Sequence, residues 1–245
     1  MPNSYFQFKQ FTIHQDRCAM KVTTDACLFG GWVVREIENR KSEVGKLLDI
    51  GVGTGLLSLM ITQKNDRLII DAIEIDREAA EQVKENINAS QWKERINIIN
   101  SDVRSFQFEN KYDIIISNPP FYEKELRSAT ESRNLAHHSD ELKLSELLSI
   151  IKNILTADGS FFILLPYKRN EEIRKLFKKQ ELHIEKILFV RQSVKHDYFR
   201  IMLKGNSHQQ KNEETDFEEV SIWDEKQQYT KEFVDLLKDY YLYLE

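Results

Sequence analysis

The stretch that most constrains the fold is a short apolar strand that runs into a glycine-rich loop and then a helix. Residues 46–50 are predicted to form a buried strand, 51–55 the loop, and 56–63 a helix with apolar periodicity. This order is the first half of a nucleotide-binding βαβ unit, in which glycine lets the backbone turn tightly and approach a ligand. The chain is therefore predicted to adopt an α/β fold built on a parallel sheet.

The glycine spacing separates two classes of cofactor. Dinucleotide sites favour G-x-G-x-x-G, whereas this loop has G-x-G-x-G, at Gly51, Gly53 and Gly55. Asp49 precedes the loop, and its carboxylate would repel a diphosphate at close range. It would attract a sulfonium or an amino-acid ammonium. A glycine turn that binds no ligand is the simpler alternative.

The second strand supplies an acid at the position where nucleotide-binding folds need one. It is predicted at 67–75 and contains Glu74, nineteen residues after Gly55. Folds of this kind place an acid there to bind ribose hydroxyls. Asp76 is expected to cap the next helix, at 77–88, because its side chain can accept unpaired backbone N–H groups.

Two further strand ends carry polar side chains. A third strand at 96–99 is followed by Asp102, whose carboxylate can accept a hydrogen bond from an exocyclic amine such as that of adenine. A fourth strand at 112–117 ends at Asn118. Ligands of doubly wound folds bind beyond the carboxyl ends of the parallel strands. We therefore expect one edge of the sheet to carry four polar side chains, those of Asp49, Glu74, Asp102 and Asn118.

The fourth strand stops abruptly at Asn118-Pro119-Pro120-Phe121. The prolines fix φ and push the preceding residue into an extended conformation, so Asn118 lies at a rigid, non-helical corner. Its amide oxygen can accept a hydrogen bond from an amine, and Phe121 can stack on a planar group. The alternative is a turn in which Asn118 bonds only its own backbone.

The rest of the chain is predicted to extend this sheet. A fifth strand is expected at 160–165, and an antiparallel pair at the sheet edge at 182–190 and 198–204. Helices are expected from residue 26 onward and at 142–155, 170–180 and 230–243. Residues 124–138 are predicted to be a helix or lid, and 205–214 a mobile loop.

Composition argues against a membrane-spanning, secreted, disulfide-rich or zinc-binding protein. The 245 residues are 41% apolar and 31% charged, as in globular proteins with a large core. No apolar run approaches the ~20 residues that cross a bilayer, and the first residues lack a secretory pattern. Cys18 and Cys27 are too few for a disulfide framework, and no paired Cys/His spacing indicates zinc. We expect a cytoplasmic protein with reduced thiols, no metal and no membrane partner.

The net charge of −5 conceals an uneven distribution. Residues 160–204 carry a balance of +6, and residues 205–245 one of −7. The basic segment permits RNA binding, although charged faces are usually only solvated.

Taken in order, these motifs resemble those of the class I S-adenosylmethionine-dependent methyltransferases. The resemblance rests on Leu48-Asp49-Ile50-Gly51-Val52-Gly53-Thr54-Gly55, Glu74, Asp102 and Asn118-Pro119-Pro120-Phe121. The Asn-Pro-Pro-Phe variant is similar to that of enzymes that methylate an amino group in a planar system. The fold it implies is Rossmann-like, with a seven-stranded, mostly parallel sheet, an antiparallel edge hairpin and helices on both faces.

Segments at both ends of the chain narrow the resemblance to one family of these methyltransferases. The segments 8–11, 16–25, 229–233 and 239–242 are similar to those of the bacterial tRNA1(Val) (adenine-37-N6)-methyltransferases. The resemblance implies methyl transfer to N6 of the adenosine beside the anticodon, with the tRNA anticodon loop as partner and no obligate protein partner. It also implies one domain over 1–245. Its parts would be a covering segment at 1–45, a catalytic core at 46–204, and a mobile loop with a docked helix at 205–245.

The resemblance also assigns roles to residues. S-adenosyl-L-methionine would lie over Gly51, Gly53 and Gly55, near Asp49 and Asn118, with Glu74 on its ribose and Asp102 near its adenine. The Asn118 side chain and the Pro119 carbonyl would accept bonds from the target N6 at the corner that Pro120 helps to fix. Phe121 would stack on the target base. No catalytic Ser, Cys or His is implied.

Three other functions remain open at this point. A glutamine N5-methyltransferase that acts on a protein shares the Asn-Pro-Pro corner, but its acceptor amide is not aromatic. A non-catalytic RNA-binding module could retain the fold without the activity. A dinucleotide oxidoreductase is disfavoured by the glycine spacing and by Asp49.

Overall fold

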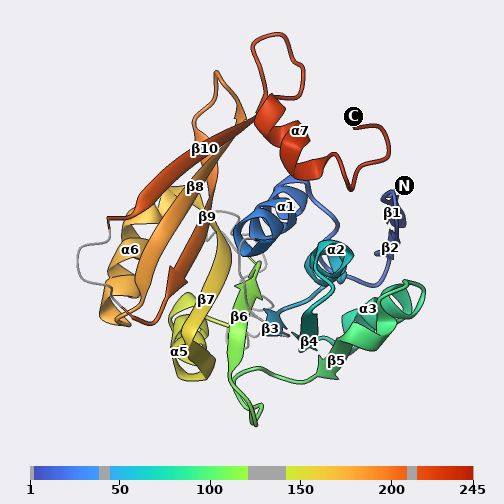
Figure 1. Cartoon of the computed structure of the whole chain (residues 1–245), viewed down its shortest axis with the longest axis vertical. Helices are drawn as coiled ribbons and strands as arrows, with labels where there is room; N and C mark the ends of the chain where they lie inside the picture. The colour runs from blue at the N-terminus through green and yellow to red at the C-terminus, as the bar shows by residue number, and fades with distance from the viewer. Residues whose placement is uncertain (1–2, 39–44, 121–141, 209–213, 245) are drawn as a thin grey trace, which may run out of the picture.

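The computed structural model describes residues 3–38, 45–120, 142–208 and 214–244 (Figure 1). Within them, eight strands form one sheet in the order β10-β8-β9-β7-β6-β3-β4-β5, and β1 and β2 form a separate antiparallel pair. The strands of the large sheet are β3 (Gly45–Ile50), β4 (Leu68–Glu74), β5 (Ile96–Asn100), β6 (Tyr112–Ser117), β7 (Leu155–Pro166), β8 (His183–Ser193), β9 (Tyr198–Asn206) and β10 (Asp216–Trp223). The small pair is β1 (Tyr5–Gln7) and β2 (Thr12–His14).

Apolar side chains on both faces of the central strands explain why the sheet is buried. Along β6, Ile114 and Ile116 pack into the core on one face, and Ile115 packs into the core on the other. Leu47 and Leu48 divide in the same way on β3. Such continuous apolar runs are typical of parallel strands covered on both faces. The predicted α/β fold with a mostly parallel sheet is confirmed.

Helices cover both faces of the sheet (Figure 1). One face packs against α1 (Thr24–Glu38), α2 (Leu56–Lys64), α3 (Arg77–Asn88) and α7 (Lys231–Leu237). The other packs against α5 (Leu144–Ile154) and α6 (Asn170–Lys179). Single 3-10 turns lie at Lys93–Arg95 and Tyr167–Arg169. The predicted cap of α3 is present, because the Asp76 carboxylate accepts the Ala79 N–H at 2.8 Å.

The described part of the sheet has eight strands, not the seven expected, and β10 is the additional one. The antiparallel hairpin of β8 and β9 is confirmed, and β10 pairs parallel with β8 outside it. The acidic residues of β10 concealed this strand in the sequence. In the fold they are paired: Lys186 on β8 donates to Glu218 at 3.0 Å, and Arg35 contacts the same carboxylate. Val220 and Ile222, which are on the same strand, are buried.

The C-terminal helix is shorter than predicted. It was expected at 230–243, whereas α7 ends at Leu237 and turns follow. Lys9 binds the residues beyond this end, where its ammonium donates to the carbonyl oxygens of Lys238 at 2.7 Å and Leu244 at 3.1 Å. The N-terminal segment thus binds backbone carbonyl groups of residues that follow α7.

Three predictions concern residues outside the described ranges. They are the stacking role of Phe121, the helix or lid at 124–138, and most of the loop at 205–214, of which 205–208 and 214 are described. The loop prediction is wrong at its start, because Gly205 and Asn206 belong to β9 and pair with Phe161 and His183. No helix in the described ranges is long and apolar enough to cross a membrane.

Candidate functional site

The register of three neighbouring strands brings Asp49, Glu74 and Asn118 to one edge of the sheet. Ser117 on β6 lies opposite Ile50 on β3, and Ile50 lies opposite Ile73 on β4. Each strand therefore ends at the same level, and the residues that follow these three are Asn118, Gly51 and Glu74. The Ser117 hydroxyl donates to the Ile50 carbonyl at 2.9 Å, which ties the two central strands together just below the edge.

The glycine loop leaves open space above its first two glycines. Gly51 and Gly53 have φ of +73° and +55°, a region that L side chains rarely adopt. A Cβ at Gly51 would meet nothing within 4 Å, and one at Gly53 would meet only the Gly51 carbonyl oxygen at 3.9 Å. Gly55 differs, because its Cβ would lie 2.6 Å from Val83 on α3. The first two glycines thus expose backbone to a ligand, and the third allows close packing.

Glu74 lies against this loop. One oxygen of its carboxylate accepts the Gly53 N–H at 2.9 Å, and the other accepts the Asp76 N–H at 3.1 Å. The side chain is half-buried. Each carboxylate oxygen has a second lone pair, so these bonds fix the orientation of Glu74 and leave acceptor capacity for hydroxyl groups.

Asp49 is almost completely buried, with a relative exposure of 1%. Its Oδ2 accepts the Ser58 hydroxyl at 2.7 Å, whereas its Oδ1 has no hydrogen-bond partner among the described residues. Burial raises the pKa of this carboxyl to about 7, and the charge of Glu74 contributes to the rise. A buried acceptor left unpaired is costly, and a cationic ligand would satisfy it.

Asn118 provides a second unpaired acceptor. Its Oδ1 is shielded from solvent and has no partner in the part of the chain that the structure describes. Pro119 is half-buried and Pro120 is exposed, so the corner lies at the protein surface. Unpaired buried acceptors thus occur at the ends of two adjacent strands, β3 and β6.

Asp102 lies two residues beyond β5 and is bound by Arg104. The guanidinium donates to the two carboxylate oxygens at 2.7–3.0 Å, and the backbone N–H of Arg104 donates at 2.9 Å. These bonds hold the pKa of Asp102 below its usual value. The sequence prediction treated Asp102 as an open acceptor and overlooked Arg104. The only signal of this pair in the sequence was that Arg104 lies two residues after Asp102.

The N-terminal segment forms a wall beside the glycine loop. The Asn86 amide donates to the carbonyl oxygens of His14 at 2.8 Å and Thr54 at 3.0 Å. The Cys18 thiol contacts the Gly53 carbonyl oxygen at 3.6 Å, and burial raises the pKa of this thiol to about 11. Sequence reasoning missed Asn86, because an amide on a polar helix is usually only solvated. Within the described residues, no group of three or more His, Cys, Asp or Glu could hold a metal ion.

Residues 32–186 match the methyltransferase small domain family. The chain is 36% identical over its full length to the full length of a tRNA1(Val) (adenine(37)-N6)-methyltransferase from Christiangramia forsetii. It is also 48% identical to the protein of that name from Dyadobacter fermentans, over 67% of this chain and 66% of that one. The chain belongs to the tRNA1(Val) (adenine(37)-N6)-methyltransferase family.

A solved structure supports the fold independently of sequence. A putative class I S-adenosylmethionine-dependent methyltransferase from Listeria monocytogenes superposes with a TM-score of 0.59, over 83% of this chain and 67% of that one. Only 13% of the aligned residues are identical, so the likeness concerns the fold alone. Membership of the tRNA1(Val) (adenine(37)-N6)-methyltransferase family and the class I fold confirm the resemblance that the motifs indicated.

Proposed function

We propose that this protein transfers a methyl group from S-adenosyl-L-methionine to N6 of adenine 37 in tRNA1(Val). Family membership over the whole chain supports the reaction and the substrate. The structural observation that carries the proposal is the unpaired, solvent-shielded Oδ1 of Asn118, which follows directly on the strand beside the open glycine loop. Because the substrate is a tRNA, the proposed site of action is the cytoplasm.

The residues at the sheet edge fit the cofactor. Gly51 and Gly53 offer exposed backbone, Glu74 offers acceptors for ribose hydroxyls, and the unpaired Oδ1 of Asp49 offers one for a cationic group. Asp102 would receive the adenine amine only if Arg104 shared or released its carboxylate. When bound, S-adenosyl-L-methionine supplies a methyl group activated by its sulfonium, whose sulfur leaves as a neutral thioether.

Asn118 and Pro119 orient the acceptor amine. An exocyclic amine has two N–H groups, and the Asn118 Oδ1 and the Pro119 carbonyl oxygen would each accept one of them. Bonds in these directions turn the nitrogen lone pair toward the methyl donor. Such positioning accounts for a large part of the rate of a two-substrate reaction. Pro120 holds the corner, and Phe121 would stack on the base once it has left the anticodon loop.

No nucleophile of the protein is needed in this reaction. Cys18 is the thiol that contacts the glycine loop, and its raised pKa keeps it protonated near neutral pH. In the proposed division of the domain, residues 1–45 cover the cofactor and 46–204 form the catalytic core. The contacts of His14 and Cys18 with Asn86 and Gly53 support this assignment.

The basic helix α6 is the proposed contact for tRNA phosphates. Arg174, Lys175, Lys178 and Lys179 are all exposed on it. Phosphate contacts made by such side chains supply affinity that does not depend on sequence.

The function is tested by incubating the purified protein with methyl-labelled cofactor and total tRNA from a strain that lacks the enzyme. We expect label in N6-methyladenosine at position 37. Label in a glutamine side chain of an added protein, or in no acceptor at all, would contradict the proposal.

A further inference from the structure

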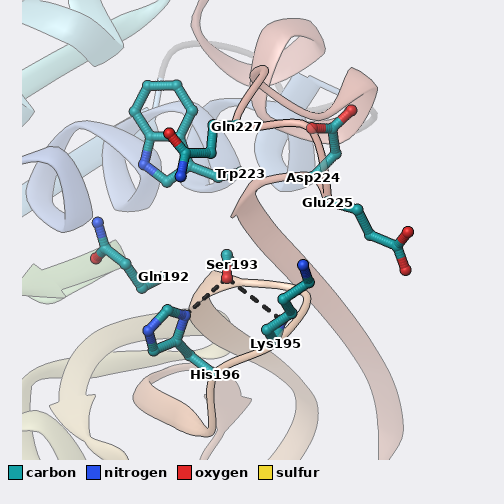
Figure 2. Close-up of a pocket in the computed structure, with 8 residues that line it drawn as sticks. All are labelled: Gln192, Ser193, Lys195, His196, Trp223, Asp224, Glu225 and Gln227. Atoms are coloured by element: carbon teal, nitrogen blue, oxygen red, sulfur yellow. Dashed lines mark hydrogen bonds between the residues drawn. The ribbon is translucent and has the colours of Figure 1, made fainter.

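A cleft of about 300 Å³ lies between two turns at the outer end of the sheet (Figure 2). One wall is the turn between β8 and β9, and the other is the turn between β10 and α7. The residues that line it are Gln192, Ser193, Lys195, His196, Trp223, Asp224, Glu225 and Gln227. Its volume is at the lower end of the range for small-ligand sites, which suits one nucleotide or a group of similar size.

The cleft lies at the same edge of the sheet as Asn118. β7 runs parallel to β6, and β9 runs antiparallel to both β7 and β8, so β8 runs in the direction of β6. β10 is parallel to β8, and both strands therefore end at the edge where β6 ends. Two strands separate β8 from β6. Three strand spacings amount to roughly 14 Å across the sheet. The register places Asn118 level with Leu188 on β8, five residues before Ser193, which adds roughly 17 Å along the strand. The two places are thus roughly 22 Å apart, a span that a few nucleotides of single-stranded RNA could bridge.

An aromatic side chain is held rigidly in one wall. Trp223 stacks on Tyr229 with ring centroids 4.1 Å apart and planes inclined by 18°. Tyr229 in turn stacks on the buried Phe233 at 4.4 Å and 7°. The indole is therefore fixed by a stack that reaches the core, and a fixed ring stacks on a nucleobase at little entropic cost.

The turn that carries Gln227 is also fixed. The Asp224 carboxylate accepts the N–H groups of Lys226 at 2.8 Å and Gln228 at 2.9 Å. Gln227 has a φ of +60°, which is strained for a residue with a side chain. Strain of this kind is often retained where a side chain serves a ligand. The carboxamides of Gln227 and Gln192 each have donors and an acceptor, as the edge of a nucleobase requires.

The opposite wall supplies positive charge. Lys195 lies on the turn between β8 and β9, and His196 is held beside it by a 2.7 Å contact between its Nδ1 and the Ser193 hydroxyl (Figure 2). The acidic groups of the cleft are Asp224 and Glu225. The Asp224 charge is partly offset by the two N–H groups it binds. A phosphate is thus best placed beside Lys195.

We propose that this cleft binds one unpaired nucleotide of the RNA substrate, distinct from the adenine that is methylated. The proposal rests on the proposed function, since it assigns a second contact to the same RNA. The base stacks against Trp223 and bonds the carboxamides, and its phosphate lies by Lys195. The cleft therefore contributes to RNA affinity and leaves the chemical step unchanged.

Matched surface variants test the assignment. Lys195→Glu and Gln227→Ala change lining residues, whereas Lys226→Glu and Gln228→Ala make the same changes on residues of the turn between β10 and α7 that do not line the cleft. Trp223 is left intact, because its ring supports Tyr229. Each protein is titrated with a fluorescent anticodon-stem-loop RNA and with S-adenosyl-L-methionine, and its KM and kcat are measured with tRNA.

The two lining variants should raise the RNA Kd and KM about tenfold, the effect of removing one good bond to a base or phosphate. Their kcat and cofactor Kd should stay unchanged, and the two controls should match the wild type. Lys195→Glu should also lower the slope of log Kd against log salt by about 1. If the wild type methylates the RNA while lining and control variants behave alike, the cleft proposal is wrong and the proposed function stands. If the wild type neither binds nor methylates it, both are wrong.

Discussion

The Glu74 carboxylate accepts a hydrogen bond of 2.9 Å from the backbone N–H of Gly53, so the end of β4 fixes the conformation of the glycine loop. An acid expected only to bind a ribose thus also organises the loop on which the rest of the cofactor would lie. The proposed binding site and the local fold share this one side chain.

Glu74→Ala should weaken S-adenosyl-L-methionine binding roughly ten- to hundredfold, because a charged hydrogen-bond acceptor is worth about 1.5–3 kcal/mol. Glu74→Gln should have an intermediate effect, since its amide oxygen can still accept from Gly53. Calorimetric titration gives both affinities, and circular dichroism checks that the fold is retained. Equal affinity in all three proteins would mean that Glu74 does not contact the cofactor.

The first and third glycines should respond differently to substitution. Both have positive φ, so alanine at either position costs about 1–2 kcal/mol in backbone strain. Gly55→Ala also places a Cβ 2.6 Å from Val83, which adds about 1–3 kcal/mol of overpacking. Thermal unfolding should therefore show the larger loss for Gly55→Ala. Cofactor titration should show a clear loss for Gly51→Ala, whose Cβ points into open space. The reverse order of stabilities would contradict the packing described.

Cofactor affinity should depend on the protonation of Asp49. Burial raises the pKa of its carboxyl from 3.8 to about 7, so between these values the folded protein holds a proton that the unfolded chain has released. This carboxyl therefore lowers the free energy of unfolding as pH rises through that window. The ionised form attracts a cationic cofactor, so affinity should increase by at most about tenfold per pH unit as pH rises toward about 7, and should level off above that value.

The matched variant for this prediction is Asp49→Asn. It should bind the cofactor weakly, with an affinity that no longer changes with pH. Calorimetry in buffers of different ionisation enthalpy should detect a proton released on cofactor binding by the wild type near pH 7, and none by the variant. An identical pH profile in the two proteins would exclude Asp49 as the titrating group.

Charge reversal on α6 should weaken RNA binding and leave cofactor binding unchanged. The double variant Lys175→Glu/Lys178→Glu should raise the KM for tRNA. The slope of log KM against log salt should also fall by about 1 for each phosphate that the helix no longer neutralises. Lys84→Glu on α3 is the control, since Lys84 is also exposed but lies on the helix layer of the opposite face. A similar response of both proteins would show that α6 is only a solvated surface.

Local patterns predicted the central part of the fold and the positions of the site residues. The apolar run of β6, the proline corner and the glycine loop each depend on neighbouring residues, so they could be recognised in the sequence. Because parallel strands end at one edge, Asp49, Glu74 and Asn118 could be placed together from the order of the strands alone.

Features that depend on distant partners could not be predicted. β10 looks too acidic for a strand until Glu218 is seen beside Lys186 and Arg35. The residues that follow α7 are bound by Lys9, which lies at the other end of the chain. The pairing of Asp102 with Arg104 is local, but the choice between that pair and an open acceptor depends on side-chain orientation, which a sequence pattern does not contain.

Asn118→Ala should abolish most methyl transfer with little change in cofactor affinity, because this side chain aligns the acceptor amine. Asn118→Asp keeps an acceptor, although it cannot donate and adds negative charge near RNA, so it should retain more activity than alanine. Single-turnover rates at saturating tRNA, together with cofactor titrations, separate the two effects. Near-normal turnover by Asn118→Ala would contradict the proposed mechanism.

The central claim is methylation of N6 at adenine 37, and the most direct measurement compares two transcripts of tRNA1(Val) that differ only at that nucleotide. With adenine at position 37, nucleoside mass spectrometry should detect one N6-methyladenosine per tRNA. With guanine there, incorporation of methyl groups should fall to background. Equal incorporation into the two transcripts, or a methylated nucleoside other than N6-methyladenosine, would contradict the account.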